Sequence, residues 1–198
     1  MGDSSINYEV PTWNQIYDLL MAQTQKIHNS SYLPDIVVAI SRGGLIPARV
    51  LVDLLEVHQL ATIQIQFYIG LGETKGEPIL KQTLSLPVKG NKILLVDDIA
   101  DTGKSLQYAI NYLSQQGATE IKTATLYYKT QSIVKPDFYE KQTCSWVVFP
   151  WESKETLRKI IQKLPSKRKQ NQEIAKLVRS GLPECIAQKL LIEMQEHP

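Results

Sequence analysis

The sequence ILLVDDIADTGKSL at residues 93–106 decides how the rest of the chain is interpreted. It begins with an apolar run that indicates a buried strand, and adjacent carboxylates follow at Asp97 and Asp98. Asp101 comes next, before small and hydroxylated residues that open a predicted helix. Paired carboxylates can accept hydrogen bonds from the hydroxyl groups of a ribose and can hold Mg²⁺ through oxygen. Backbone N–H groups of residues 102–105, at the start of the helix, favour a phosphate. The stretch therefore predicts a site for a polyhydroxylated, phosphorylated ligand.

Two other interpretations of this stretch are less consistent with its residues. The first is a nucleotide-binding P-loop, which Gly103, Lys104 and Ser105 would end. A P-loop needs a glycine five positions before Gly103, and Asp98 stands there, where its carboxylate would face the phosphates. The second is a strand end with solvated acids. Carboxylates this close repel one another and normally need a cation or hydroxyl partners, so this interpretation is disfavoured as well.

Length and composition indicate an ordinary globular protein. A chain of 198 residues with 43% hydrophobic residues can bury one full core and a small appendage. Cys144 and Cys185 lie far apart and near no histidine cluster, so neither a disulfide framework nor a zinc site is expected. The N-terminus has no basic start followed by an apolar run, and no stretch approaches the roughly 18 apolar residues of a membrane span. We therefore expect a cytoplasmic protein with no membrane partner.

The C-terminal part differs in charge from the rest of the chain. Residues 153–198 carry ten Lys and Arg against five Asp and Glu, whereas residues 1–152 carry 12 against 15. The basic run at residues 167–169 is interpreted as a solvated linker rather than a nucleic-acid patch. Apolar residues at helical spacing near 174–178 and 186–194 predict two helices, which are too short to be stable without packing. We expect a domain at 1–152 and a helical extension at 153–198.

Hydrophobic periodicity predicts an α/β fold with an open, mainly parallel sheet flanked by helices. The helices are expected from a cap at Thr12 to about residue 27, at 46–55, and from the turn at residues 102–105 to an end at Gly117. The strands are expected at 36–40, 61–68, 93–99, 121–128 and 144–149, with a mobile loop at about 69–82. In such folds the ligand binds beyond the carboxyl ends of the strands, and residues 97–105 lie at such an end.

The pattern at residues 93–106 closely resembles the phosphoribosyl pyrophosphate (PRPP) signature of type I phosphoribosyltransferases. Residues 41–44, Ser-Arg-Gly-Gly, resemble the pyrophosphate loop of the 6-oxopurine enzymes that act on xanthine, hypoxanthine or guanine. The resemblance covers about residues 8–152 and implies the type I phosphoribosyltransferase fold. It also implies Mg²⁺-dependent transfer of 5-phosphoribosyl from PRPP to a 6-oxopurine in purine salvage. A homo-oligomer, either a dimer or a tetramer, is implied as well.

The resemblance assigns a role to each matching residue. Asp97 and Asp98 would bind the ribose and metal, and Asp101 would be the catalytic residue that accepts a proton from the base. The 5′-phosphate would be held by Thr102, Gly103, Lys104 and Ser105. The pyrophosphate would be held by Ser41, Arg42, Gly43 and Gly44, with a non-proline cis peptide at Ser41–Arg42. The purine base would be bound by Lys129, Trp146 and Val147.

Some assignments remain open from the sequence. Glu152 matches an acid that holds the metal through water, but it could equally lie at an exposed chain end. The loop at 69–82 would close over pyrophosphate, with Lys75 or Lys81 as its basic residue. A regulatory protein that senses PRPP or a nucleotide and binds nucleic acid through its basic tail is the alternative function. Asp101, Lys129 and Trp146 together favour an enzyme, because a sensor needs no proton acceptor facing a stacked base.

Overall fold

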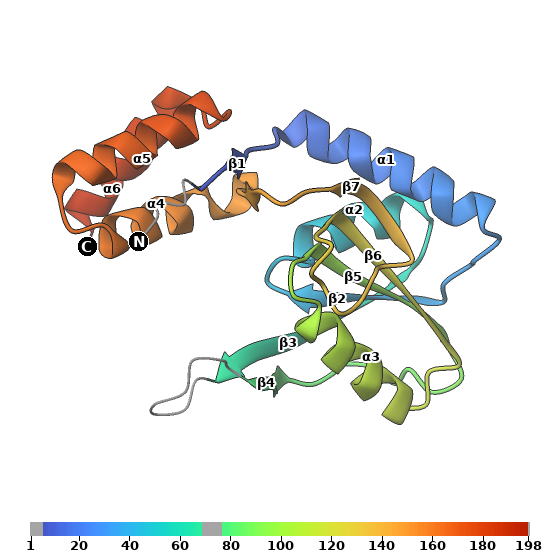
Figure 1. The fold of residues 1–198 in the computed structure, drawn as a ribbon. Coiled ribbons are helices and arrows are strands. Elements are labelled where there is room, and N and C mark those ends of the chain that lie inside the picture. Colours follow the sequence, from blue (N-terminus) through green and yellow to red (C-terminus); the bar gives the residue numbers. More distant parts are fainter. Residues whose placement is uncertain (1–5, 69–76, 198) are drawn as a thin grey trace. The chain divides into compact units, whose positions relative to one another are not determined.

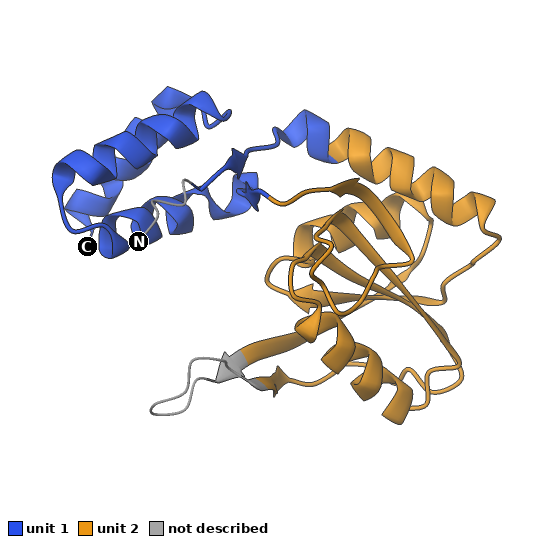
Figure 2. Cartoon of the chain, viewed as in Figure 1, with its two compact units in different colours: residues 1–16, 145–198 blue, residues 17–144 orange. Residues whose placement is uncertain are grey.

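The computed structural model describes residues 6–68 and 77–197, which belong to two compact units. One unit comprises residues 17–144, and the other combines residues 1–16 with residues 145–198 (Figure 2). The predicted boundary between residues 152 and 153 stays a prediction. No helix in the described part of the chain combines the length and the apolar character that crossing a membrane requires.

The larger unit is built on a six-stranded sheet with the strand order β4-β3-β2-β5-β6-β7 (Figure 1). Neighbouring strands are parallel except β3 and β4, which form an antiparallel pair. The strands are β2 (Ile36–Ser41), β3 (Gln59–Tyr68), β4 (Glu77–Gln82), β5 (Lys92–Ala100), β6 (Glu120–Tyr128) and β7 (Phe138–Gln142). The fold class is thus the mainly parallel α/β sheet that the periodicity predicts.

Helices cover this sheet: α1 (Trp13–Asn29), α2 (Leu45–Leu54) and α3 (Lys104–Gln115). The predicted cap of α1 is confirmed, because the Gln15 N–H donates to Thr12 Oγ1 at 3.2 Å and the Thr12 N–H donates to Gln15 Oε1 at 2.8 Å. Further along α1, Gln23 Nε2 donates to the Thr125 carbonyl of β6 at 2.8 Å, which ties the helix to the sheet. Gly117 has a φ of +87° and ends α3 as predicted.

The core explains why the central strands consist of unbroken apolar runs. Val38 of β2 and Leu95 of β5 pack with Leu106 of α3 in one cluster of buried residues. Val37 and Leu94, which alternate with them and point to the opposite face, are also fully buried. Because both faces of β2 and β5 are covered, their side chains are apolar on both, as in parallel sheets generally.

Three expectations about strands need correction. Residues 138–142 form an edge strand, β7, although no strand was expected there. Of the expected strand at 144–149, only β8 (Trp146–Val147) forms, and it pairs with β1 (Tyr8–Glu9) in a separate two-stranded sheet. Residues 77–82 of the expected loop form β4, and residues 69–76, with Lys75, lie outside the described residues. Lys81 lies on β4.

The smaller unit has its own core. After the short 3₁₀ helix η1 (Pro150–Glu152) come the helices α4 (Ser153–Lys163), α5 (Lys167–Arg179) and α6 (Glu184–Glu196). The two expected tail helices are confirmed as α5 and α6, whereas α4 was not predicted. Leu177 of α5 and Ala187 of α6 are buried in one cluster with Val148 and Leu157. The tail therefore packs on its own chain, as its amphipathic pattern requires.

Replacing Leu177 with alanine is expected to lower the free energy of unfolding of this unit by about 2–5 kcal/mol. Leu177 is fully buried at the centre of the cluster, so truncation leaves a cavity among α4, α5 and α6. Amide hydrogen exchange of α4 and α5 would measure the loss. The matched control is Ile192→Ala, because Ile192 is 56% exposed and its truncation should change stability by no more than about 0.5 kcal/mol. Equal effects of the two variants would contradict this packing.

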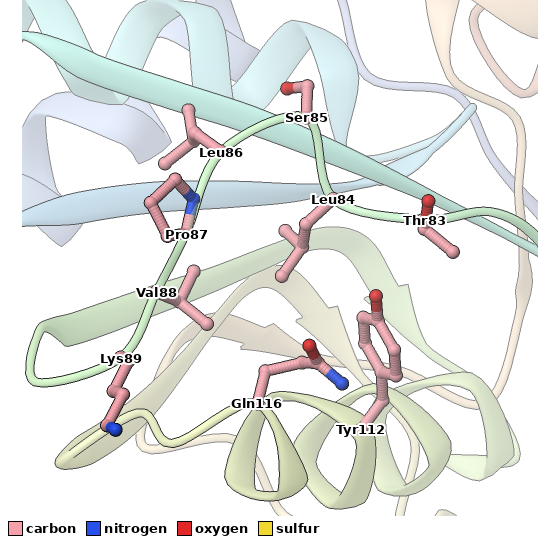
Figure 3. Close-up of a pocket in the computed structure, with 9 residues that line it drawn as sticks. All are labelled: Thr83, Leu84, Ser85, Leu86, Pro87, Val88, Lys89, Tyr112 and Gln116. Atoms are coloured by element: carbon pink, nitrogen blue, oxygen red, sulfur yellow. The ribbon is translucent and has the colours of Figure 1, made fainter.

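A crevice of about 590 Å³ lies between the segment that precedes β5 and the end of α3 (Figure 3). Residues 83–89 line it together with Tyr112 and Gln116. It lies at the amino end of β5, whereas the acidic residues that define the predicted site lie toward the carboxyl end of the same strand. Size alone therefore does not identify the functional site of this fold.

Candidate active site

Asp97 and Asp98 lie near the carboxyl end of β5, as the sequence predicts. Asp98 is only 8% exposed, and its N–H donates to Asp97 Oδ1 at 3.0 Å. Burial, followed by the charge of Asp98, raises the pKa of Asp97 well above its usual range. Hydrogen bonds from the N–H groups of Asp98 and Gly44 act in the opposite direction. Two carboxyl groups held this close and this deep suit cation binding or hydroxyl donors.

The loop at residues 41–44 meets these acids because β2 lies beside β5 in the sheet. A Cβ added to Gly43 would overlap the carboxylate of Asp98, and one added to Gly44 would overlap the carbonyl oxygen of Val96. Glycine at both positions therefore lets the loop backbone approach β5. The Ser41–Arg42 peptide is cis, as the resemblance implies. The structure thus brings together two segments that lie more than fifty positions apart in the sequence.

The predicted phosphate loop forms the start of α3. Gly103 is the N-cap residue, with a φ of +76° that favours glycine. A Cβ added to Gly103 would overlap Ser132 Oγ, so the loop after β6 packs directly on this turn. The Ile133 N–H also donates to the Thr102 carbonyl at 3.0 Å. The first N–H groups of a helix lack partners within it and can bind an anion, which fits a phosphate at residues 102–105.

Asp101 and Lys129 form an ion pair in the structure, with Lys129 Nζ 3.2 Å from Asp101 Oδ2. The Lys129 side chain is 11% exposed, whereas that of Asp101 is 53% exposed and open to a ligand. Gln131 Nε2 donates to the other oxygen, Asp101 Oδ1, at 3.0 Å. Sequence reasoning missed Gln131, whose only signal was its position two residues after the predicted base-binding lysine. Both oxygens of the candidate catalytic carboxylate are therefore oriented by donors from one loop.

Trp146, Val147 and Glu152 belong to the smaller unit, so their roles toward the base and metal stay predictions. Trp146 is 40% exposed, while Val147 beside it is buried. Glu152 Oε1 accepts a hydrogen bond from the Phe149 N–H at 3.2 Å, at the start of η1. This contact gives Glu152 a local structural function whether or not it also holds a metal.

Comparison with known proteins shows what this chain is similar to. The model of the phosphoribosyl transferase domain matches residues 9–155. The xanthine-guanine phosphoribosyltransferase of Nitratidesulfovibrio vulgaris (strain Hildenborough) is 30% identical over 145 residues, covering 72% of this chain and 83% of that protein. The hypoxanthine-guanine phosphoribosyltransferase of Saccharomyces cerevisiae is 27% identical over 128 residues, covering 56% of this chain and 57% of that protein.

The fold agrees with solved structures as well. The purine phosphoribosyltransferase of Pyrococcus horikoshii is 35% identical, with a TM-score of 0.67 over 74% of this chain and 94% of that chain. A xanthine-guanine-hypoxanthine phosphoribosyltransferase of Helicobacter pylori shares the fold at 20% identity, with a TM-score of 0.65. The predicted fold class is therefore confirmed.

Proposed function

Because this chain belongs to the phosphoribosyl transferase domain family, we propose that it transfers the 5-phosphoribosyl group of PRPP to a 6-oxopurine base. The base would be hypoxanthine, guanine or xanthine, and the products a nucleoside monophosphate and pyrophosphate in purine salvage. One observation carries the proposal: Asp98 meets the loop at 41–44, while Asp101 and Lys129 pair beside the phosphate loop. The acids and the two loops suit the ribose and the phosphates of PRPP, and the Asp101–Lys129 pair suits the edge of a purine base.

The chain's residues would bind PRPP along its length. N–H groups of residues 102–105 would fix the 5′-phosphate and so orient the reacting carbon of the ribose. Asp97 and Asp98 would accept hydrogen bonds from the ribose hydroxyls. Their negative charge also favours the positive charge that develops on the sugar ring in the transition state. Arg42 and the N–H groups of the glycine loop would stabilise the pyrophosphate that leaves.

The base would be activated by the Asp101–Lys129 pair. Asp101 would accept the proton from N7 of the purine as N9 attacks the reacting carbon of the ribose. Lys129 would donate a hydrogen bond to the purine O6, which requires its ammonium group to turn from Asp101 toward the ligand. The ion pair thus sets both groups 3.2 Å apart before the base binds.

A magnesium ion fits the donor set of this site. Within the described residues, no three His, Cys, Asp or Glu side chains form a cluster that could hold a metal alone. Mg²⁺ is typically held by one or two carboxylates together with water and substrate oxygens, which matches Asp97 and Asp98 with PRPP. The ion would supply positive charge to the departing pyrophosphate. Glu152 would assist through water.

Steady-state rates with PRPP, Mg²⁺ and each of the three bases would test this function. Formation of the nucleoside monophosphate with equimolar pyrophosphate is expected, and chelation of the metal should abolish it. PRPP binding without turnover on any base would instead support a PRPP-sensing protein. We further propose that the protein is a homo-oligomer, either a dimer or a tetramer, and sedimentation of the full chain would measure its mass. We also propose that it is cytoplasmic.

Replacing Trp146 with alanine is expected to raise KM for the base by roughly 5- to 150-fold, corresponding to ~1–3 kcal/mol of stacking. The indole is partly exposed and offers a flat face to a planar heterocycle. KM for PRPP should change by less than about threefold, because PRPP has no aromatic ring to stack on the indole. Trp146→Phe keeps an aromatic face and is the matched control. Equal rises of both KM values in Trp146→Ala would show that Trp146 supports the fold instead.

A further inference from the structure

A pocket of about 270 Å³ lies among the three helices α4, α5 and α6 of the smaller unit, which pack on one another (Figure 1). Every residue that lines it lies between positions 161 and 195. The match to the family model ends at residue 155, so the pocket is built entirely by a segment outside that match. None of the residues proposed for the reaction lines it. Spaces between the helices of a bundle are common places for small-molecule sites.

The lining follows one face of α5 and one face of α6. On α5 the residues are 167, 170, 171 and 174, which keep the spacing of a single helical face. On α6 they are 191, 194 and 195. Only residues 180–183 join the two helices, so α5 and α6 run antiparallel as a helical hairpin. The start of α5 therefore lies beside the end of α6, and the pocket has two different ends.

The end away from the start of α5 is aliphatic. Ile174 of α5 and Leu191 of α6 line it, and both side chains are half-buried. Ile161 adds aliphatic surface from α4, and Met194 adds it from α6. Methionine is unbranched and flexible, so its side chain can adapt to the shape of a bound group. These side chains suit an alkyl chain.

The end at the start of α5 is polar and carries one charge. Lys167 is the first residue of α5, Asn171 lies one turn further along, and Gln195 lies near the end of α6. No Asp or Glu lines the pocket. Within the described part of the chain, the ammonium group of Lys167 has no ion-pair partner, and the side-chain amides of Asn171 and Gln195 have no hydrogen-bond partner. One cation and two amide donors are therefore available to an anion.

Hydrogen bonds hold the corner between α4 and α5 on which the pocket depends. Gln170 Nε2 donates to the carbonyl oxygens of Ile161 and Leu164, both at 3.0 Å. The last carbonyl groups of a helix lack partners within it, so this side chain caps α4 and fixes it against α5. Ser166 Oγ accepts from the Lys169 N–H at 3.4 Å and caps the start of α5. The lining is thus held in place by the protein itself.

We propose that this pocket binds a small aliphatic carboxylate, a ligand that the proposed reaction neither uses nor forms. The carboxylate would contact Lys167 and the amide groups of Asn171 and Gln195. The alkyl chain would lie between Ile174 and Leu191, away from water. A water molecule occupies about 30 Å³ in the liquid, so the pocket has room for about nine atoms of similar size. Hexanoate has this size and this chemistry.

Calorimetric titration of the full chain with hexanoate, without PRPP or a base, would test this site. The site variant is Lys167→Gln. The matched control is Arg168→Gln, which removes the same charge from the next position of α5, outside the pocket. Both side chains are exposed, so neither substitution should unfold the unit. Amide hydrogen exchange at saturating hexanoate would locate the ligand on the chain.

Hexanoate should bind the full chain with a Kd below about 1 mM. It should bind Lys167→Gln at least fivefold more weakly and Arg168→Gln within twofold of the parent affinity. Uncharged 1-hexanol, and dodecanoate, which is too long for the pocket, should each bind at least fivefold more weakly than hexanoate. Amide groups of residues 161–174 and 191–195 should gain protection.

Three results would each overturn the proposal. They are equal affinity of Lys167→Gln and Arg168→Gln for hexanoate, tighter binding of dodecanoate than of hexanoate, and protection confined to residues 41–44 and 97–105. Absence of binding to the full chain would also overturn it. Because neither PRPP nor a base is present, these outcomes do not depend on the proposed reaction.

Discussion

Replacing Asp101 with asparagine should lower kcat by about 10²–10⁴-fold, the usual contribution of a positioned general base. Asparagine has nearly the same shape and can still accept a hydrogen bond from Gln131, but it cannot take a proton from the base. KM for PRPP should stay within about threefold, because Asp101 would contact the base rather than the sugar phosphate. Steady-state kinetics with PRPP and each purine would measure both constants.

Controls separate proton transfer from the contacts that hold Asp101. Lys129→Met removes the ion pair and should raise KM for the base, since the lysine would contact the purine O6. Gln131→Leu keeps the carboxylate and removes one hydrogen bond of about 1 kcal/mol, so kcat should fall only about fivefold. Asp101→Asn should also lower stability, because it leaves the ammonium of Lys129, whose side chain is only 11% exposed, without its carboxylate partner. A turnover close to that of the parent enzyme would remove Asp101 from the mechanism.

The helices and strands that could be predicted from the sequence are those with a clear apolar pattern or a clear terminal residue. β2 and β5 are covered on both faces, so each consists of an unbroken apolar run, and α3 has an apolar stripe and a terminal glycine. β7 lacked such a signal, because an edge strand buries little of its surface and only Phe138 within it is buried. α4 has apolar residues at helical spacing, Leu157 and Ile160, so its sequence does carry a helical signal.

The residues of the candidate site also differ in whether the sequence could predict them. Asp97 and Asp98 could be placed from the sequence, because a buried strand fixes where its end lies and the charges there are conspicuous. Gln131 could not, since its contact with Asp101 depends on how the loop after β6 folds back over the turn at Gly103. No periodicity or charge pattern encodes that approach. Packing between segments distant in the sequence is what the structure adds.

Replacing Asp97 with asparagine is expected to lower kcat/KM for PRPP at least about 100-fold, or ~2.7 kcal/mol, and yet to stabilise the fold at neutral pH. The activity falls because one anionic partner of the ribose hydroxyls and of Mg²⁺ is lost. Stability rises because burial and the charge of Asp98 disfavour the ionised carboxylate of Asp97 in the folded state. Asparagine keeps an oxygen that can accept the Asp98 N–H and carries no charge.

The pH dependence of this gain follows from the raised pKa of Asp97. In the unfolded chain the carboxyl group titrates near its ordinary value of about 3.9, and in the folded chain it titrates higher. Below both values it is neutral in either state and costs nothing. As the pH rises above the ordinary value, the unfolded chain releases this proton while the folded chain still keeps it, so the parent protein loses stability until the pH passes the folded pKa, and the loss is constant above that. Asp97→Asn has no proton to release and does not lose this stability. The difference between their urea midpoints should therefore be small near pH 4 and large at pH 8.

The control is Asp53→Asn, which removes an exposed charge on α2. The difference between its urea midpoint and that of the parent protein should not increase from pH 4 to pH 8. If the urea midpoints of the parent protein and of Asp97→Asn differ by the same amount from pH 4 to pH 8, the pKa of Asp97 is not raised in the folded chain. The prediction would then be wrong.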